Sequence, residues 1–379
     1  MPYCDHNATA PLRPEAREAV MRALSLTGNP SSVHAGGRAA RAMVEEAREA
    51  VARLAGAKAE AVIFTSGATE ANALALWGAA EAAADAGNPI TRLLVSAIEH
   101  KSVLKTAEAV AEHMNIRLEI VPVTADGVVD AKALTALLRG EGRALVAVMA
   151  ANNETGVVQP VAEISRLCRD AGALLLVDAV TAAGKIPLDA GLCDYMTLSG
   201  HKLGAPQGVG ALIVSETAPL AAQLVGGGQQ KGLRAGTENL SGIAGLGAAA
   251  KAVLANDEEC AHLAALRGHF ERALKEAVPE AVIFGANAPR LPNTSNVALP
   301  GLAAENMVIA LDLDGMMVSS GSSCSSGKIA ASHVLAAMGV SDLSSVRISF
   351  GWNSLPDDAN AVVASLVKLW QRARPRVAA

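Results

Sequence analysis

Aromatic residues and charges are both scarce in this sequence of 379 residues. Aromatic residues make up 2% of it and charged residues 18%, whereas 51% of the residues are hydrophobic. The low aromatic content argues against an aromatic-rich β-barrel, and the abundance of Ala, Val and Leu favours helices packed on a sheet. A chain of this length and hydrophobicity buries a large core, so we expect a soluble globular protein of two domains.

Basic clusters and long apolar runs are missing as well. The formal net charge is -5 and no block of Lys or Arg occurs, which argues against a nucleic-acid partner and favours a small-molecule substrate. The apolar tract around 243–254 is short and contains Lys251, so no membrane span is expected. The first ten residues lack the features of a secretion signal, and the predicted location is the cytoplasm.

Cysteine is rare too, and its spacing matches neither a zinc site nor a disulfide framework. The five cysteines form an odd set without close pairs, so we predict no metal site and a reducing compartment. Four of them lie in or beside apolar patterns and are interpreted as structural: Cys4, Cys168, Cys193 and Cys260.

Between residues 61 and 216, short apolar runs alternate with amphipathic helical patterns, which is typical of βαβ units. Most runs are apolar throughout, as expected for strands covered on both faces. These runs predict strands at 61–64, 93–96, 118–122, 145–149, 174–177, 195–198 and 210–214. Apolar residues at three-and-four spacing predict helices at 37–54, 102–114, 131–138 and 161–171. The sequence therefore predicts an α/β fold with a mostly parallel sheet.

A glycine-rich stretch at 226–236 and a helical pattern up to about residue 256 follow this region. The segment beyond mixes helices with a few β-type runs. We therefore predict a large domain of residues 14–256 and a smaller α+β domain of residues 1–13 and 257–379.

Lys202 stands directly after a predicted strand, in the sequence Ser199-Gly200-His201-Lys202. Strand ends of this kind line active sites in α/β proteins. Lysine forms a Schiff base with an aldehyde where its surroundings ease the loss of its proton. Taken alone, a lysine in a loop is far more often a solvated surface charge, so this interpretation depends on partners.

Other predicted strand ends supply such partners. Asp178 follows the apolar run 173–177, where an acid can hold the pyridine nitrogen of pyridoxal phosphate (PLP) protonated, although a helix N-cap is the plainer interpretation. The strand-loop-helix passage 64–70 offers amides and Thr69 to a phosphate. His100 can stack on a flat ring or transfer protons. Each signal is weak alone, but all of them fall at carboxyl ends of strands in one sheet.

Cys324 is the second strong signal, because it lies in the Ser- and Gly-rich run 318–327. Cysteine usually prefers the core, so a cysteine in a polar loop indicates reactivity rather than packing. The plain alternative is an unremarkable exposed cysteine. An ordinary thiol pKa of about 8.5 leaves little thiolate at neutral pH, so attack requires a base or cation nearby.

Nearly the whole chain resembles the cysteine desulfurases of the NifS-like group, within the class V aminotransferase family and its aminotransferase-like PLP fold type I. The resemblance rests on several stretches besides the strand ends described above. They are 28–34, 152–160, 226–239, the run around Cys324 and 347–351.

For the cofactor, the resemblance implies a homodimer that binds PLP on Lys202, with Asp178 on the ring nitrogen and His100 over the ring face. It also implies a set of residues around the phosphate and the ring: Ala68, Thr69, Asn153, Thr181, Ser199, His201 and, from the other subunit, Thr237.

For the reaction, the resemblance implies that Asn153 and Arg347 hold the carboxylate of L-cysteine. Lys202, His100 and Cys324 are the implied catalytic residues. The Cys324 thiolate would attack the sulfur of the substrate, which leaves alanine and a persulfide on Cys324. An acceptor protein, either an iron-sulfur scaffold or a sulfurtransferase, would take this sulfur, with iron-sulfur cluster assembly as the expected pathway.

Three positions depart from the family pattern. Thr181 stands where a Gln contacts the ring hydroxyl of the cofactor, Gln230 where Glu is common, and Trp352 where a basic residue is common. Thr181 is a shorter donor than Gln, so the cofactor's electronics can differ.

Other functions remain open at this point. Another class V enzyme, such as an aminotransferase or a selenocysteine or cysteine lyase, shares everything except the role of Cys324. A catalytically silent PLP protein in sulfur traffic is disfavoured because Lys202 and Cys324 are both retained. A plain nucleotide-binding protein is disfavoured because no Gly-x-Gly-x-x-Gly follows the first strand.

Overall fold

A seven-stranded sheet forms the centre of the computed structural model, which describes residues 1–320, 332–341 and 343–377. Its strand order is β1-β7-β6-β5-β4-β2-β3. The strands are β1 (Val62–Thr65), β2 (Ile90–Ser96), β3 (Arg117–Val121), β4 (Arg143–Met149), β5 (Leu174–Asp178), β6 (Tyr195–Ser199) and β7 (Gly210–Val214). Among these seven, β7 alone runs opposite to the others. The predicted mostly parallel sheet is confirmed, with strand ends shifted by three residues at most.

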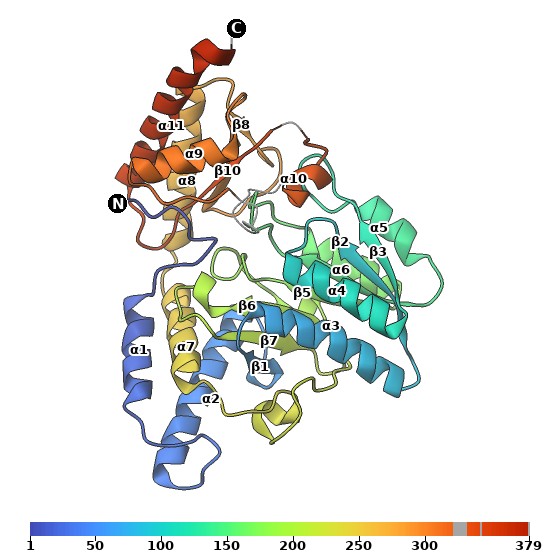
Figure 1. The fold of residues 1–379 in the computed structure, drawn as a ribbon. Coiled ribbons are helices and arrows are strands. Elements are labelled where there is room, and N and C mark those ends of the chain that lie inside the picture. The colour runs from blue at the N-terminus through green and yellow to red at the C-terminus, as the bar shows by residue number, and fades with distance from the viewer. Residues whose placement is uncertain (321–331, 342, 378–379) are drawn as a thin grey trace.

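Helices cover both faces of this sheet (Figure 1). One face packs against α3 (Ala68–Asp85) and α4 (Lys101–Met114). The other packs against α2 (Ala35–Ala55), α5 (Ala131–Leu138), α6 (Val161–Asp170) and α7 (Leu240–Leu254), while α1 (Pro14–Leu24) packs on α7. Successive strand residues alternate between the two cores: Leu93 and Val95 face one, and Leu94 faces the other. Most strand residues are therefore apolar, as the sequence pattern predicted.

The four predicted helices are confirmed, and the small shifts at their ends have local causes. α2 begins two residues earlier than predicted because His34 caps it by accepting a hydrogen bond from the Gly37 amide. α4 begins at Lys101 because His100 is its N-cap. The cap places the His100 side chain at the helix start, next to the carboxyl ends of the strands.

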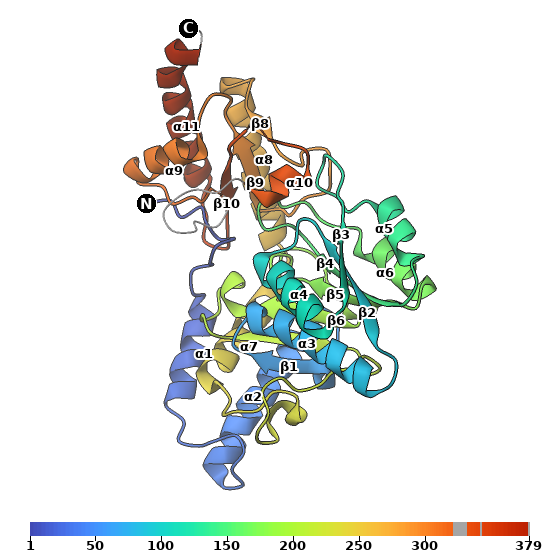
Figure 2. The same cartoon turned by 45° about the vertical axis from the view of Figure 1, so that its right-hand side comes forward.

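A second, three-stranded antiparallel sheet lies above the first in Figures 1 and 2. Its strands are β8 (Val282–Ile283), β9 (Thr294–Ala298) and β10 (Val346–Ser349), and its neighbouring helices are α8 (Glu259–Ala277), α9 (Ala304–Leu313), α10 (His333–Ala337) and α11 (Pro356–Val377). This part has a core of its own, in which Phe270 and Phe350 meet edge to face.

The N-terminal segment joins this second sheet before the chain descends to α1. The Cys4 amide donates to the Met317 carbonyl, and the His6 amide donates to the Ser349 carbonyl. The division into residues 14–256 and residues 1–13 with 257–379 stays a prediction, and the separate sheets and cores support it.

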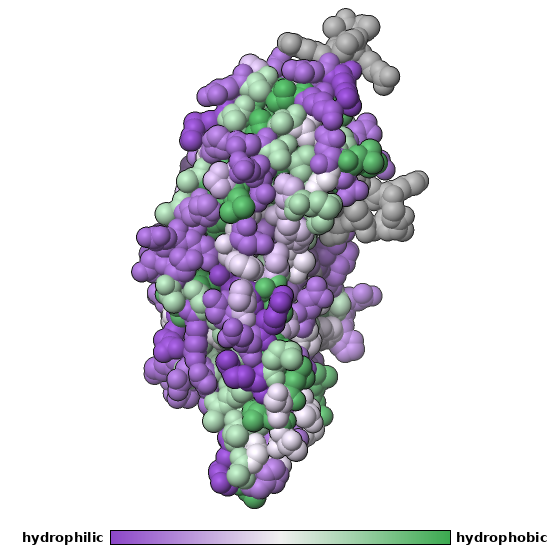
Figure 3. Space-filling view, turned by 90° about the vertical axis from the view of Figure 1, so that its left-hand side faces the viewer, coloured by the Kyte–Doolittle hydropathy of each residue, from purple (hydrophilic) through white to green (hydrophobic). Residues whose placement is uncertain are grey.

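Within the part of the chain that the structure describes, no helix combines the length and hydrophobicity that a membrane crossing requires. On the face that carries α1, polar and apolar residues are mixed, with apolar residues gathered toward the lower end in Figure 3. Met21 and Leu24 of α1 are 60% and 66% exposed.

Gly247 allows α7 to approach α2 closely, and this contact generates a stability prediction. A methyl group at Gly247 would lie 2.5 Å from the Cα atom of Ala47, which is backbone and can move only with its helix. We expect Gly247→Ala to lower the free energy of unfolding by about 1–3 kcal/mol, measured by urea denaturation. The matched control is Gly228→Ala, where the added methyl meets no atom within 4 Å. Equal stability of the two variants would contradict this account of the α2–α7 contact.

Candidate active site

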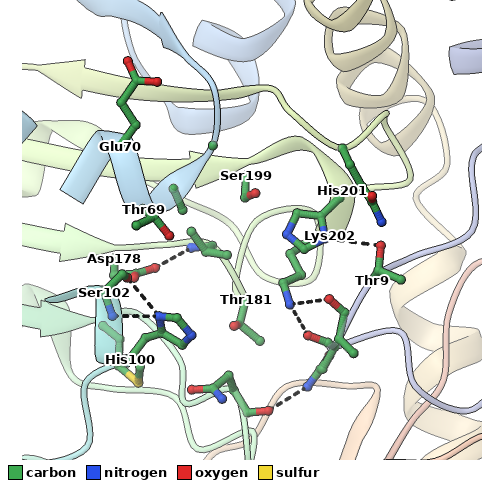
Figure 4. Close-up of a pocket in the computed structure, with 18 of the residues that line it drawn as sticks. Thr9, Thr69, Glu70, His100, Ser102, Asp178, Thr181, Ser199, His201 and Lys202 are labelled. Carbon is green, nitrogen blue, oxygen red and sulfur yellow. Dashed lines mark hydrogen bonds between the residues drawn. The ribbon is translucent and has the colours of Figure 1, made fainter. Parts of the chain in front are cut away.

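A cavity of about 800 Å³ opens where the carboxyl ends of β1, β2, β4, β5 and β6 meet. Segments that follow these strands converge on it, because parallel strands end at the same edge of a sheet. Ten residues proposed from the sequence line this cavity (Figure 4): Ala68, Thr69, His100, Asn153, Asp178, Thr181, Ser199, His201, Lys202 and Arg347.

Lys202 lies in the short helix η3 (Gly200–Lys202) that follows β6. Its Nζ atom donates hydrogen bonds to the backbone oxygens of Asn7 and Ala8, the latter at 2.8 Å. Burial lowers the pKa of Lys202 to about 7, and the positive charge of Arg347 adds to this effect. A large fraction of this amine is therefore unprotonated near neutral pH.

Asp178 is buried at the end of β5. Its carboxylate accepts hydrogen bonds from the Val180 amide at 3.0 Å and from Asn72 Nδ2 at 3.1 Å. Burial raises the pKa of Asp178, and these hydrogen bonds oppose the shift because they stabilise the charged form. A cation beside this carboxylate would stabilise the charged form further.

Asn72 is a residue that the sequence analysis did not identify. It is fully buried in α3, and besides Asp178 it contacts Thr197 and Ser102: Thr197 Oγ1 donates to Asn72 Oδ1 at 2.8 Å, and Asn72 Nδ2 donates to Ser102 Oγ at 3.0 Å. It thus connects α3 with β5, β6 and α4. The signal that could have revealed it is a single amide side chain within the Ala-rich pattern 68–85.

His100 lies beside the Asp178 end of the cavity (Figure 4). Its Nδ1 atom accepts a hydrogen bond from the Ser102 amide at 3.1 Å, so in the neutral ring the proton is on Nε2. Burial lowers the pKa of His100, and the negative charge of Asp178 opposes this shift. The neutral imidazole is therefore favoured at neutral pH, and Nε2 can donate a hydrogen bond.

The start of α3 forms another side of the cavity. Gly67 is its N-cap and provides no side chain, and the first-turn amides of a helix lack intrahelical acceptors. Ala68 and Thr69 therefore offer unpaired amides and a hydroxyl at the positive end of the helix dipole, which favours an anion. Ser199 and His201, from β6 and η3, also line the cavity.

Arg347 reaches the cavity from β10 of the second sheet. Its Nη2 atom lies 2.7 Å from Asp5 Oδ1 and its Nη1 atom donates to the Asn153 carbonyl at 3.0 Å. Its Nε atom is buried and has no acceptor among the described residues. The N-terminal segment, which includes Asp5, was assigned to the second domain by its sequence but was not predicted to contact the site.

Glu99 is a second carboxyl group that the sequence analysis did not identify. It is fully buried, and its Oε1 atom accepts a hydrogen bond from the Met149 amide at 2.7 Å. Burial and the charge of Asp178 raise its pKa well above the usual value. Burial and the neighbouring carboxylate therefore both disfavour a second negative charge beside Asp178.

Among the residues that the structure describes, one predicted site residue does not line the cavity. Thr237 is exposed and is absent from the cavity lining, so its predicted contact with the other subunit stays a prediction. Cys324 lies outside the described residues. Among those that are described, no cluster of His, Cys, Asp or Glu could hold a metal ion.

The structure also shows how the three departures from the family pattern fit locally. Thr181 is buried and lines the cavity. Trp352 donates from Nε1 to the Pro11 carbonyl at 3.1 Å, and the Arg13 guanidinium lies over its ring. Gln230 is buried and lies away from the cavity lining.

Comparison with known proteins agrees with this geometry. The family model described as aminotransferase class-V matches residues 2–362. The chain belongs to the class V aminotransferase family.

The chain is similar to enzymes named cysteine desulfurase. It is 36% identical to cysteine desulfurase IscS of Dictyoglomus turgidum, over 98% of this chain and 95% of the relative. It is 43% identical to a cysteine desulfurase of Cereibacter sphaeroides, over 89% of this chain and 87% of the relative. The solved structure of a NifS-like protein from Rickettsia africae matches with a TM-score of 0.86 at 32% identity, over 98% of this chain and 99% of that one.

Class V aminotransferases are PLP-dependent, and the residues around the cavity fit this cofactor. The amine of Lys202 suits its aldehyde carbon, the carboxylate of Asp178 suits its ring nitrogen, and the start of α3 suits its phosphate. These three groups come from η3, β5 and α3 and line one cavity.

The lowered pKa of Lys202 can be tested by chemical labelling of the apoprotein. Only the free amine reacts with acetic anhydride, so labelling rises as the pH passes the pKa. We expect a midpoint near pH 7 for the peptide that contains Lys202, against about 10.4 for lysine in an unfolded chain. In Arg347→Gln the midpoint should move to higher pH, because a neighbouring positive charge is removed. A wild-type midpoint near pH 10 would contradict the assigned environment of Lys202.

The bridging role of Asn72 predicts a loss of stability. Asn72→Ala removes one buried hydrogen-bond partner from Asp178 and one from Thr197, and we expect the free energy of unfolding to fall by roughly 1–3 kcal/mol. Thermal or urea unfolding of the apoprotein measures this change. Asn88→Ala, at an exposed position, is the control and should change stability by less than about 0.5 kcal/mol. Similar effects of both substitutions would exclude the bridging role.

Proposed function

We propose that this chain is a PLP-dependent cysteine desulfurase, which removes sulfur from L-cysteine and leaves L-alanine and a persulfide on Cys324. The observation that carries the proposal is the Lys202 amine, which lines one cavity with Asp178 and the start of α3. Similarity to cysteine desulfurases over nearly the whole chain supports the choice of reaction within the family.

When bound, PLP supplies an electron-withdrawing ring that weakens bonds at the α-carbon and β-carbon of an amino acid. Lys202 would hold the cofactor and then take up or give a proton at its Nζ atom. A pKa of about 7 suits both tasks, because the amine is then close to half protonated at neutral pH.

Asp178 and His100 would act on the ring from two directions. The Asp178 carboxylate, fixed by Asn72 and the Val180 amide, would keep a pyridine nitrogen protonated. The imidazole of His100 is oriented by the Ser102 amide on Nδ1, so its Nε2 proton is available to the cofactor or substrate.

Arg347 and Asn153 would bind the carboxylate of the substrate. The guanidinium is buried, and its Nε atom has no acceptor within the described part of the chain. Arg347 lines the cavity, and its positive charge there favours a carboxylate, with which a guanidinium forms strong charge-assisted hydrogen bonds.

The sulfur transfer itself would take place on Cys324. Its thiolate attacks the sulfur atom of the substrate, the S–S bond forms, and the bond between sulfur and the β-carbon breaks. The β-carbon takes up a proton, so the products are alanine and a persulfide. The sulfur would then pass to an acceptor protein, which is either an iron-sulfur scaffold or another sulfurtransferase. The proposed pathway is iron-sulfur cluster assembly, and the proposed location is the cytoplasm.

The enzyme would work as a homodimer, in which Thr237 reaches the phosphate of the other subunit. Exposed apolar side chains of α1, of the connection between α1 and α2 and of the segment before η4 support an interface. They are Met21, Leu24, Val33, Leu224 and Val225, the last of which is 87% exposed.

The reaction is tested by mixing the purified holoenzyme with L-cysteine and following alanine and protein persulfide together. The wild type should form both, with the persulfide on the peptide that contains Cys324. Cys324→Ser should lose persulfide and nearly all alanine formation, whereas Cys260→Ser, which removes a half-buried thiol elsewhere, should retain both.

Two results would overturn the proposal in different ways. Unchanged alanine formation in Cys324→Ser would exclude the thiol role and favour a lyase. Amino-group transfer to a keto acid without any release of sulfur would favour an aminotransferase.

A further inference from the structure

The segment 229–238 packs against the turn between β1 and α3, the phosphate end of the proposed site. It begins with the short helix η4 (Gln229–Gly232). Gln230 and Lys231 have left-handed backbone conformations, with φ of 44° and 61°. Such conformations are unfavourable for residues other than glycine and persist where surrounding contacts fix them.

Gln230 supplies one of these contacts, because its buried side chain joins three parts of the chain. Its Oε1 atom accepts from the Phe64 amide of β1 at 2.8 Å and from Arg48 Nη1 of α2 at 3.1 Å. Its Nε2 atom donates to Glu238 Oε1 at 2.5 Å. The segment is therefore fixed to β1, the strand that leads into the phosphate turn.

Arg234 supplies the other contact, with Glu70 in the first turn of α3. Arg234 Nε lies 2.7 Å from Glu70 Oε1, and Nη2 donates to Oε2 at 3.3 Å. The same Oε2 atom accepts the Ser66 amide at 2.7 Å. Both side chains are only 20% exposed, so this pair is screened less than a surface pair.

Glu70 is a negative charge one residue away from Thr69 at a helix start that is proposed to bind phosphate. Burial raises the pKa of Glu70, but the hydrogen bonds from Arg234 and Ser66 outweigh this, and its pKa lies below the usual value. Figure 4 shows the Glu70 carboxylate pointing away from Lys202 and His100. Without a cation beside it, this carboxylate would repel the phosphate and could turn toward the free amides of the helix start.

We propose that Arg234 is a positioning residue for the cofactor phosphate: it neutralises Glu70 and holds it on the Ser66 amide, so that the start of α3 binds an anion. This inference rests on the proposed function, because it assumes that PLP binds with its phosphate at this helix. It assigns Arg234 no contact with the cofactor.

The test compares PLP with pyridoxal, which lacks the phosphate, in equilibrium dialysis of the apoprotein. In Arg234→Ala we expect the dissociation constant of PLP to rise roughly tenfold, because a partly buried charge loses its partner. The dissociation constant of pyridoxal should change less than about twofold, since it carries no phosphate.

Removal of the unpaired charge should restore binding. The double variant Glu70→Gln with Arg234→Ala should bind PLP within about threefold of the wild type, because no carboxylate remains to repel the phosphate. Arg234→Lys keeps the charge and should stay close to the wild type. Arg290→Ala breaks the comparable pair with Glu271, outside the cavity, and should leave PLP affinity unchanged even where it lowers stability.

Two outcomes would overturn the role of Arg234. If Arg234→Ala binds PLP and pyridoxal more weakly by the same factor, Arg234 supports the whole cavity rather than the phosphate site. If Glu70→Gln fails to restore binding in a folded double variant, neutralisation of Glu70 is not its function. Failure of the wild type to bind PLP would instead refute the proposed function, so the two failures are distinguishable.

Discussion

The active site depends on the parallel alignment of β1, β2, β4, β5 and β6, because this alignment places the chain segments after all five strands at one edge of the sheet. Lys202, Asp178 and His100 are separated by up to about a hundred positions in the sequence, yet each lies at the end of its strand or within a few residues after it. The reversed strand β7 does not disturb this arrangement, since β1 on its far side runs with the others again.

Burial then shifts the pKa values of the ionisable groups in that cavity, and hydrogen bonds decide how large each shift is. Burial disfavours the charged form of both Lys202 and Asp178. Asp178 receives donors from Asn72 and the Val180 amide, which stabilise its charge. Lys202 donates to backbone carbonyls of the N-terminal segment and has the like charge of Arg347 nearby, so its pKa falls to about 7. The same cavity thus contains a carboxylate whose burial is partly offset by hydrogen bonds and an amine that loses its proton easily.

The phosphate end of the site is supported from outside the cavity. Gln230 accepts from the edge strand and donates to Glu238, a combination that a glutamate at this position could not make in its charged form. The departure of this chain from the common Glu at this position therefore has a local physical reason, since Glu238 already supplies the carboxylate. Together with the Arg234–Glu70 pair, this contact connects the segment 229–238 to both elements of the phosphate turn.

The sequence alone determined the strand and helix pattern, because two-sided burial imposes continuous apolar runs and helix packing imposes the three-and-four spacing. It also indicated Lys202, Asp178, His100 and Thr69, since each stands at a predicted strand end, and its motifs indicated the family. The tertiary structure was needed for Asn72, Glu99, Asp5 and Arg234. Their roles depend on contacts between residues distant in the chain, and a buried amide or an ion pair leaves no periodic signal in a sequence. Whether Lys202 is a solvated charge or a weakened base was likewise decided by burial, which only the packed structure supplies.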